Sequence, residues 1–306
     1  MRERNDFEES LAEILGSDNE VTPFQLAFLS DLTKDELASF RRAWIETSQD
    51  RRRQIISHLT KLQSDDPCLN FTRVLLAGLE GSDDDIRSQA VMALEAEEDS
   101  TIITPLIHLL REDESEMVRV ATAIALGRFA LLAAVKELAP AMSEEIYYNL
   151  LTVIEDKTET DEVKRRCIEA IAPLDSSRVK ELIEQAYNSD NVKDRATALY
   201  AMGRNCNPTW LPTIIKEKGS DEPEIRYEVA EACGELGMEE ATTTLVELAG
   251  DADIHVREAS VRALQQIGGP SAEQALHQLM NSPHQDICER AKEALDNLQI
   301  FGFFDL

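Results

Sequence analysis

The sequence predicts an all-α fold, a solenoid in which helical hairpins stack side by side. The main observation is a motif between residues 160 and 298 whose basic position recurs every 31 residues, at Lys164, Arg195, Arg226 and Arg257, with Cys288 in the last copy. A fixed period of this length is typical of stacked structural repeats. Hydrophobic residues make up 43% of the chain and aromatic residues only 5%, which favours helix-on-helix packing. No alternating run of β-branched residues indicates a strand.

Residues 1–46 lack the motif and are predicted to form an N-terminal helical cap. Apolar residues at helical spacing precede Gly16, and a second short helix around 22–30 has Pro23 in its first turn. Thr33 and Glu36 form a capping box that begins a third helix. Because a repeat array needs its first apolar face covered, we interpret this segment as a cap. The alternative is a separate docking module.

The repeat array is predicted to span residues 47–298 in about eight units. Three copies at less even spacing, around Arg52, Arg87 and Arg119, precede the regular ones, and the copy around Arg119 matches the motif best of the three. Second helices are expected between the first helices, at 176–187, 208–218, 239–249 and 271–281. Asp221 is the expected N-cap of the helix that has Pro223 in its first turn.

One irregularity interrupts the array near residues 131–160. Arg119 and Lys164 are 45 residues apart, which is 14 more than the period. Pro140 separates two apolar-periodic segments there, and we expect an additional or lengthened helix at 143–155. One face of this helix would consist of Tyr147, Leu150, Leu151 and Ile154. Such a break forms a binding site or reflects tolerated loop variation.

The motif D-x-x-x-V-R-x-x-A-x-x-A-L-G, followed by a second helix, resembles the HEAT repeat. Its short period is similar to the HEAT-like subclass named after phycobilisome lyases, and the resemblance implies a right-handed superhelix over residues 47–298. In that family the basic residue bonds an acid of an adjacent turn, which forms a ladder along the stack. The resemblance implies that the basic residues of the ladder are Arg87, Arg119, Lys164, Arg195, Arg226 and Arg257. It implies acids such as Asp113, Asp161, Asp190, Asp221, Asp251 or Asp253.

The last copy and the C-terminal tail depart from the pattern. Cys288 replaces the basic residue, which suits a terminal unit that has no further repeat to bind. Residues 299–306 form a hydrophobic tail, and its Ile300, Phe301, Phe303 and Phe304 either fold back over the last hairpin or form a docking peptide.

The charge of the chain restricts its partners. The formal net charge is −28, and such a surface repels nucleic acid and anionic membranes. It favours a basic protein partner or only maintains solubility. The chain has no signal-peptide pattern and no window with the ~20 apolar residues of a membrane span. Its five cysteines have no paired spacing, so we expect a cytoplasmic protein.

Recognisable reactive motifs are missing from the sequence. None of the five histidines precedes a glutamate, so the metal-binding His-Glu pairs of HEAT-like deoxyhypusine hydroxylases are missing. Phosphate-binding glycine loops and nucleophile elbows are also missing. We therefore expect no catalytic, cofactor or metal site.

Two classes of function remain open. The first is a non-catalytic scaffold that binds a protein partner along its second helices. The second is a bilin lyase-like role in chromophore attachment, which rests on the resemblance in fold alone. A HEAT-like DNA glycosylase is disfavoured by the charge. The candidate partner surface consists of Arg178, Glu181, Glu184, Thr213, Lys216, Thr243, Glu247, Gln274 and Gln278.

Overall fold

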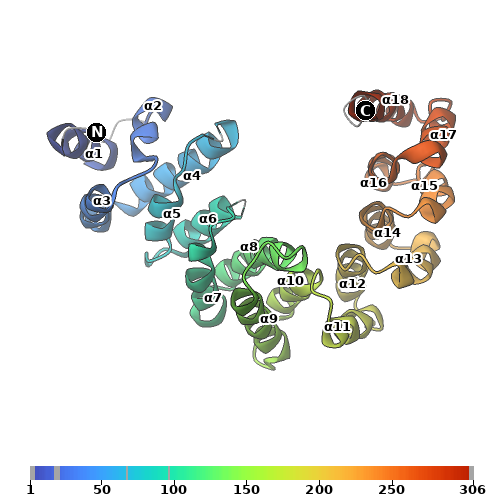
Figure 1. Cartoon of the computed structure of the whole chain (residues 1–306), viewed down its shortest axis with the longest axis horizontal. Coiled ribbons are helices and arrows are strands. Elements are labelled where there is room, and N and C mark those ends of the chain that lie inside the picture. Colours follow the sequence, from blue (N-terminus) through green and yellow to red (C-terminus); the bar gives the residue numbers. More distant parts are fainter. Residues whose placement is uncertain (1–3, 17–20, 67, 96, 303–306) are drawn as a thin grey trace. The chain divides into compact units, whose positions relative to one another are not determined.

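The computed structural model describes residues 4–16, 21–66, 68–95 and 97–302, and of residues 4–6 and 299–302 only the backbone. These residues form 18 α-helices, five short 3-10 helices and no strand. The fold is an all-α solenoid of stacked helical hairpins, as the sequence predicts (Figure 1). The right-handed sense of the superhelix stays a prediction, as do the boundaries at residues 46 and 298.

The chain divides into two compact units, 1–170 and 171–306. In the first unit the first helices of successive hairpins are α4, α6, α8 and α10, and the second helices are α5, α7 and α9. The elements of the first unit are α1 (Arg4–Gly16), α2 (Pro23–Leu26), η1 (Ala27–Leu29), α3 (Lys34–Glu46), α4 (Gln49–Asp65), α5 (Thr72–Gly78), α6 (Asp84–Leu94), η2 (Ser100–Ile102), α7 (Ile103–Glu112), α8 (Glu116–Ala134), α9 (Pro140–Glu155) and α10 (Asp161–Ile171).

The second unit has its second helices on one side and its first helices on the other (Figure 1). Counted with the 3-10 turns η3 and η5 that precede α13 and α15, its second helices begin within two residues of the predicted positions. The elements are α11 (Ser177–Tyr187), α12 (Val192–Arg204), η3 (Pro208–Trp210), α13 (Leu211–Lys216), η4 (Glu217–Gly219), α14 (Pro223–Leu236), η5 (Glu239–Ala241), α15 (Thr242–Leu248), α16 (Ile254–Ile267), α17 (Gly269–Leu279) and α18 (Gln285–Gly302).

Small residues let successive first helices approach each other closely. A Cβ added at Gly203 of α12 would lie 2.8 Å from Cα of Ala232 in α14. One repeat later, a Cβ at Gly234 would lie 3.0 Å from Cα of Ala263 in α16. Real Cβ atoms are not found so close to a neighbouring backbone, so the glycine of the motif is required by packing.

The capping box that the sequence predicts is present in α3. The Thr33 hydroxyl accepts from the Glu36 N–H at 3.3 Å, and the Glu36 carboxylate accepts from the Thr33 N–H at 2.8 Å. The N-cap expected at Asp221 is wrong. Because Pro223 is the first residue of α14, Glu222 takes the N-cap position, and its side chain makes no capping bond.

The irregularity near 131–160 is a lengthened hairpin. Helix α8 has 19 residues and α9 has 16, whereas the other hairpin helices between α5 and α17 have at most 14. Pro140 begins α9, because a proline is tolerated in the first turn. The fully buried row is Ile146, Leu150 and Val153, and the predicted Tyr147, Leu151 and Ile154 beside it are half-buried. The predicted face was therefore rotated by about one position.

Helix α8 contradicts the prediction that no window of the sequence is apolar enough for a membrane span. An 18-residue window of α8 has a mean hydropathy of 1.6, so by length and composition alone it could cross a membrane. Half of this window is buried in the structure, and α8 packs against α6, α7 and α9. Its first turn also carries Arg119, which bonds Glu159. These contacts are those of a core helix.

The N-terminal helices contact the first hairpin, α2 with α4 and α3 with α5, and their role as a cap stays a prediction. Phe7, Leu11 and Ile14 of α1 are buried, and Arg51 of α4 donates from Nε to the Ile14 carbonyl at 2.8 Å. The alternatives for the C-terminal tail lie outside the described residues, because neither the side chains of 299–302 nor residues 303–306 are described.

Candidate partner-binding surface

Arginines near the start of the first helices bond acids of the following repeat. Arg87 donates from Nε and Nη2 to the two Asp113 carboxylate oxygens at 2.7 and 2.8 Å. Arg226 binds Asp251 in the same bidentate way, at 2.6 and 2.8 Å. Each arginine also donates to the carbonyl six residues before it, Gly81 for Arg87 and Ser220 for Arg226. One guanidinium thus joins its own loop to the next.

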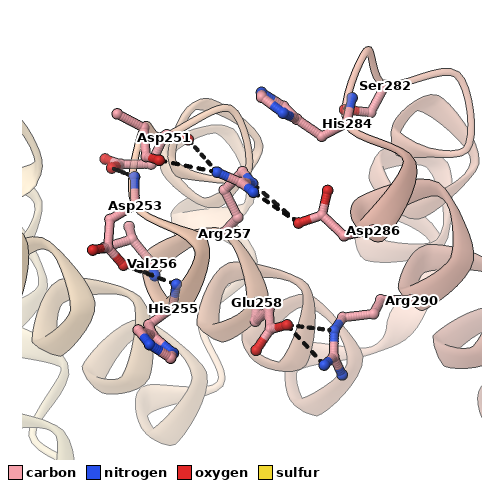
Figure 2. A network of polar contacts seen from close by, with 11 residues as sticks. Asp251, Asp253, His255, Val256, Arg257, Glu258, Ser282, His284, Asp286 and Arg290 are labelled. Carbon is pink, nitrogen blue, oxygen red and sulfur yellow. Dashed lines mark hydrogen bonds and ion pairs between the residues drawn. The ribbon is translucent and has the colours of Figure 1, made fainter.

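Two further arginines reach acids that the sequence reasoning did not name. Arg119 bonds Glu159 at 2.8 Å through two nitrogens, across the lengthened hairpin. Arg257 bonds Asp286 in the first turn of α18 at 2.8 Å, and Figure 2 shows its guanidinium between Asp286 and the loop of Asp251. In this last rung Cys288 donates from Sγ to the Ser282 carbonyl at 3.1 Å.

The carboxylates of these rungs are held in the charged form. The pKa of Asp251 is lowered, first by the hydrogen bond from Arg226, while burial opposes the shift. For Asp113, burial is the largest influence and raises the pKa, but hydrogen bonds from Arg87 and the Ser115 N–H together lower it. The rungs are therefore charge-assisted bonds at neutral pH.

Six of the nominated ladder residues join no ion pair in the described part of the chain: Lys164, Arg195, Asp161, Asp190, Asp221 and Asp253. Lys164 and Asp190 belong to different units, and no bond is described for either side chain. Asp221 is exposed and also forms no ion pair, because Arg226 uses the carbonyl of Ser220 instead. Asp221 is thus corrected as a ladder acid, whereas a pairing of Asp190 with Lys164 of the other unit stays a prediction. The Nε of Arg195 is buried without a hydrogen-bond partner.

A second row of ion pairs joins the first helices of the second unit. It connects α12 to α14 through Arg204 and Glu235, at 3.2 Å, and α14 to α16 through Glu231 and Arg262. Figure 2 shows the third pair, in which Arg290 of α18 donates twice to Glu258 of α16, at 2.8 and 3.0 Å. Three ion pairs on this side of the unit therefore join successive hairpins.

The nominated partner surface lies on α11, α13, α15 and α17 of the second unit. Arg178 and Thr213 are half-buried, and the other seven residues are exposed. Arg178 and Glu181 pair within α11 at 2.9 Å. Glu247 forms an ion pair with another hairpin, through Lys218. The exposed residues are Glu181, Glu184, Lys216, Thr243, Glu247, Gln274 and Gln278.

The first unit has a groove between α3, α5 and α7 that sequence reasoning missed. Its volume is about 650 Å³, and Leu76, Leu79, Pro105 and Leu109 line it with apolar atoms. Arg41 and Glu80 pair across one side at 3.3 Å. The other polar lining residues are Arg87, Thr104, His108, Glu112 and Asp113. No motif marks the groove, and its one sequence signal is apolar residues just outside the buried rows of two second helices.

No group of three or more His, Cys, Asp or Glu side chains among the described residues is arranged to hold a metal ion. Two cysteines are core residues: burial raises the pKa of the Cys233 thiol to about 12 and that of Cys167 further. A thiol with so high a pKa is a poor nucleophile at neutral pH. Cys68 and Cys206 are exposed.

Comparisons with known proteins agree on the repeat. A family model for HEAT repeats matches residues 72–149, 179–248 and 211–296. No curated protein matches the sequence. Yeast importin-β (Kap95p) is 12% identical with a TM-score of 0.57 over 96% of this chain and 46% of that chain, so the chain spans less than half of the importin. A structure of the complex of CpcE and CpcF of phycocyanin lyase from Nostoc sp. PCC7120 is 15% identical with a TM-score of 0.52, over 92% of this chain and 97% of that chain.

Proposed function

The chain belongs to the HEAT-repeat family, and we propose that it is a non-catalytic scaffold that binds a protein partner along the surface of its second helices. The observation that carries the proposal is the difference between the two sides of the second unit. The first helices use their charges in ion pairs with neighbouring hairpins, whereas most nominated residues of the second helices are exposed. Glu184, Lys216, Thr243, Gln274 and Gln278 among them form no described ion pair, so their polar groups are available to another chain.

The groove of the first unit supports the same proposal. Its volume of about 650 Å³ is in the range of clefts that bind ligands of small-molecule size, about 300–1,000 Å³. An apolar floor with charged groups at the rim is the usual composition of a site that anchors a partner's side chain. The groove lies on the second helices α5 and α7, as the nominated surface does on the equivalent helices of the second unit.

The charge of the chain gives the expected character of the partner. A net charge of −28 attracts a basic protein over distances up to about 8 Å at physiological ionic strength. The same charge disfavours nucleic acid and anionic membranes as partners. We propose a basic protein partner and a cytoplasmic location.

Site-specific photo-crosslinking in the native cell tests the proposal. A benzophenone amino acid at Glu181, Thr243 or Gln274 on the second helices is expected to capture one and the same protein. Matched labels at Glu258 and Arg262 on the first helices should not capture it. Capture of the same protein at equal yield from both sets of positions, or none from the second helices, would contradict the proposed surface.

A second candidate function is chromophore attachment or removal. It is favoured by the likeness to the phycocyanin lyase complex, which extends over nearly the whole of both chains but shows the fold alone. Mixing the purified chain with free bilins and recording visible absorbance distinguishes the two functions. A red shift with a stable adduct supports the lyase-like role, and an unchanged spectrum supports the scaffold.

A further inference from the structure

One rung of the arginine ladder in the second unit has no acid. Among the described residues, no hydrogen bond or ion pair joins the Arg195 side chain to another group, and its Nε is buried. The equivalent Arg226 and Arg257, one and two repeats later, are both bonded to carboxylates.

The hydrogen bonds of the loops show which residue should supply the missing acid. In the occupied rungs, Asp113 accepts from the N–H of Ser115 at 2.9 Å, and Asp251 accepts from the N–H of Asp253 at 2.8 Å. In the Arg195 rung the corresponding acceptor is Ser220, whose Oγ accepts from the N–H two residues later at 3.3 Å. Ser220 therefore occupies the place of the acid, but it is one atom shorter and uncharged.

No other acid fills the place. Glu224 is two residues before Arg226, as Asp286 is two residues before Cys288, yet Glu224 is exposed and joins no described ion pair. Glu217 accepts from the hydroxyl of Tyr187 at 2.6 Å. The Arg195 charge opposes the rise in the pKa of Tyr187, which burial and Glu217 bring to about 12. The guanidinium is therefore near this hydrogen bond and unpaired.

We infer that the Arg195 rung binds a carboxylate supplied from outside the chain. The guanidinium fork donates two parallel N–H bonds to a carboxylate, as Arg226 does to Asp251. The Ser220 hydroxyl accepts the loop N–H, so its own O–H is available to donate to the same ligand. The ligand is a protein side-chain or terminal carboxylate, or a small carboxylic acid.

The last rung provides a matched control. Ser282 stands six residues before Cys288, as Ser220 stands six before Arg226, and its Oγ also accepts the N–H two residues later, at 3.2 Å. In that rung the arginine already has an acid, because Arg257 bonds Asp286 at 2.8 Å. A serine therefore stands in the place of the acid in both rungs, but the guanidinium is unpaired only at Arg195 and not at Arg257.

Thermal unfolding of the full chain in sodium acetate, against sodium chloride of equal ionic strength, tests the inference. We expect a saturable rise in Tm with half-saturation on the order of 10 mM, typical of one charge-assisted bidentate contact. Ser220→Asp supplies a tethered carboxylate, so it should raise Tm by about 2–4 °C and abolish the acetate effect. Ser282→Asp should leave both Tm and the acetate effect unchanged. An acetate effect that persists in Ser220→Asp overturns the inference.

A second measurement does not depend on the stability of a variant. The Nε–H resonance of Arg195 in the parent chain should shift with acetate, and those of Arg226 and Arg257 should not. An Arg195 resonance that does not shift with acetate would overturn the inference. A Glu224→Gln variant that loses stability and gains acetate binding would also overturn it, because Glu224 of the same chain would then be the acid that pairs with Arg195.

The source of the carboxylate is distinguished by comparing the affinity of the chain for acetate with its affinity for N-acetyl-aspartate amide, whose side chain carries the carboxylate. Binding at least ten-fold tighter for the peptide-like probe indicates a protein carboxylate, and equal binding indicates a free acid. The acetate test is independent of the proposed scaffold function, because it needs no partner. It can fail while the crosslinking result stands, and the reverse also holds.

Discussion

Replacing Arg226 with alanine tests whether the arginine ladder holds successive hairpins together. Arg226 makes three hydrogen bonds, two to the Asp251 carboxylate and one to the Ser220 carbonyl at 2.7 Å. The side chains are 15% and 9% exposed. In the variant, Asp251 keeps the N–H of Asp253 but loses its cation.

The free energy of unfolding that Arg226→Ala is expected to lose lies between two limits. Exposed ion pairs contribute about 0–1 kcal/mol, and removing one partner of a buried pair costs about 3–5 kcal/mol. Because this pair is mostly buried but reaches solvent at its edge, we expect Arg226→Ala to destabilise by about 2–3 kcal/mol. The pKa of Asp251 is lowered mainly by Arg226. The contribution is therefore fully present above the unfolded aspartate pKa of about 3.9 and is lost as the pH falls through the lower folded pKa.

The assay is urea unfolding combined with hydrogen exchange of α14 and α16, because repeat arrays need not unfold in one step. Arg262→Ala is the matched control: it removes an arginine–acid pair that also joins α14 to the next repeat, but its side chains are 47% and 27% exposed. We expect a loss of at most about 1 kcal/mol for the control. Equal losses in the two variants, or a loss for Arg226→Ala that is unchanged at pH 2.5, would refute the reasoning.

Three further predictions concern packing, thiols and the N-terminal helix. Gly203→Ala places a Cβ 2.8 Å from the backbone of the neighbouring first helix, so differential scanning calorimetry should show a loss of about 1–3 kcal/mol, whereas Gly219→Ala, with no atom within 4 Å, should change stability by less than about 0.5 kcal/mol. Cys206 is exposed and should react with a thiol reagent in the folded protein, while Cys233 should react only after unfolding. Arg51→Ala removes the bond to the α1 backbone, and exchange of the α1 amides should accelerate more than that of α4.

The period and the apolar pattern were enough to predict the hairpins, because both follow from the requirement that each hairpin cover its neighbour. The glycine of the motif has the same origin, since Gly203 and Gly234 lie against the backbones of the next first helices. The capping box of α3 was predicted because both of its partners are three residues apart in the sequence. Local and periodic constraints are visible in a single chain.

The partners of the arginines were harder to predict, because several acids lie within reach of each loop. The position of Asp221 in the turn predicts it as a ladder acid, but the carboxylate that Arg226 binds is that of Asp251, which a loop hydrogen bond from the Asp253 N–H orients. Glu159 binds Arg119 and Asp286 binds Arg257, and neither acid lies at a position that the repeat motif defines. The groove on α5 and α7 was missed because a half-buried leucine such as Leu76 has the same spacing as a core leucine.

A strongly acidic chain in which the arginine of one ladder rung is unpaired can recognise a partner in two separable steps. The net charge of −28 acts over several ångströms and affects how fast a basic partner arrives. The Arg195 guanidinium acts only at hydrogen-bond distance, where a partner carboxylate would fix the register along the stack. Raised salt should therefore slow association, while Ser220→Asp, which fills the rung, should mainly speed dissociation. If both changes altered the association rate alone, the contact at Arg195 would play no part in holding the partner.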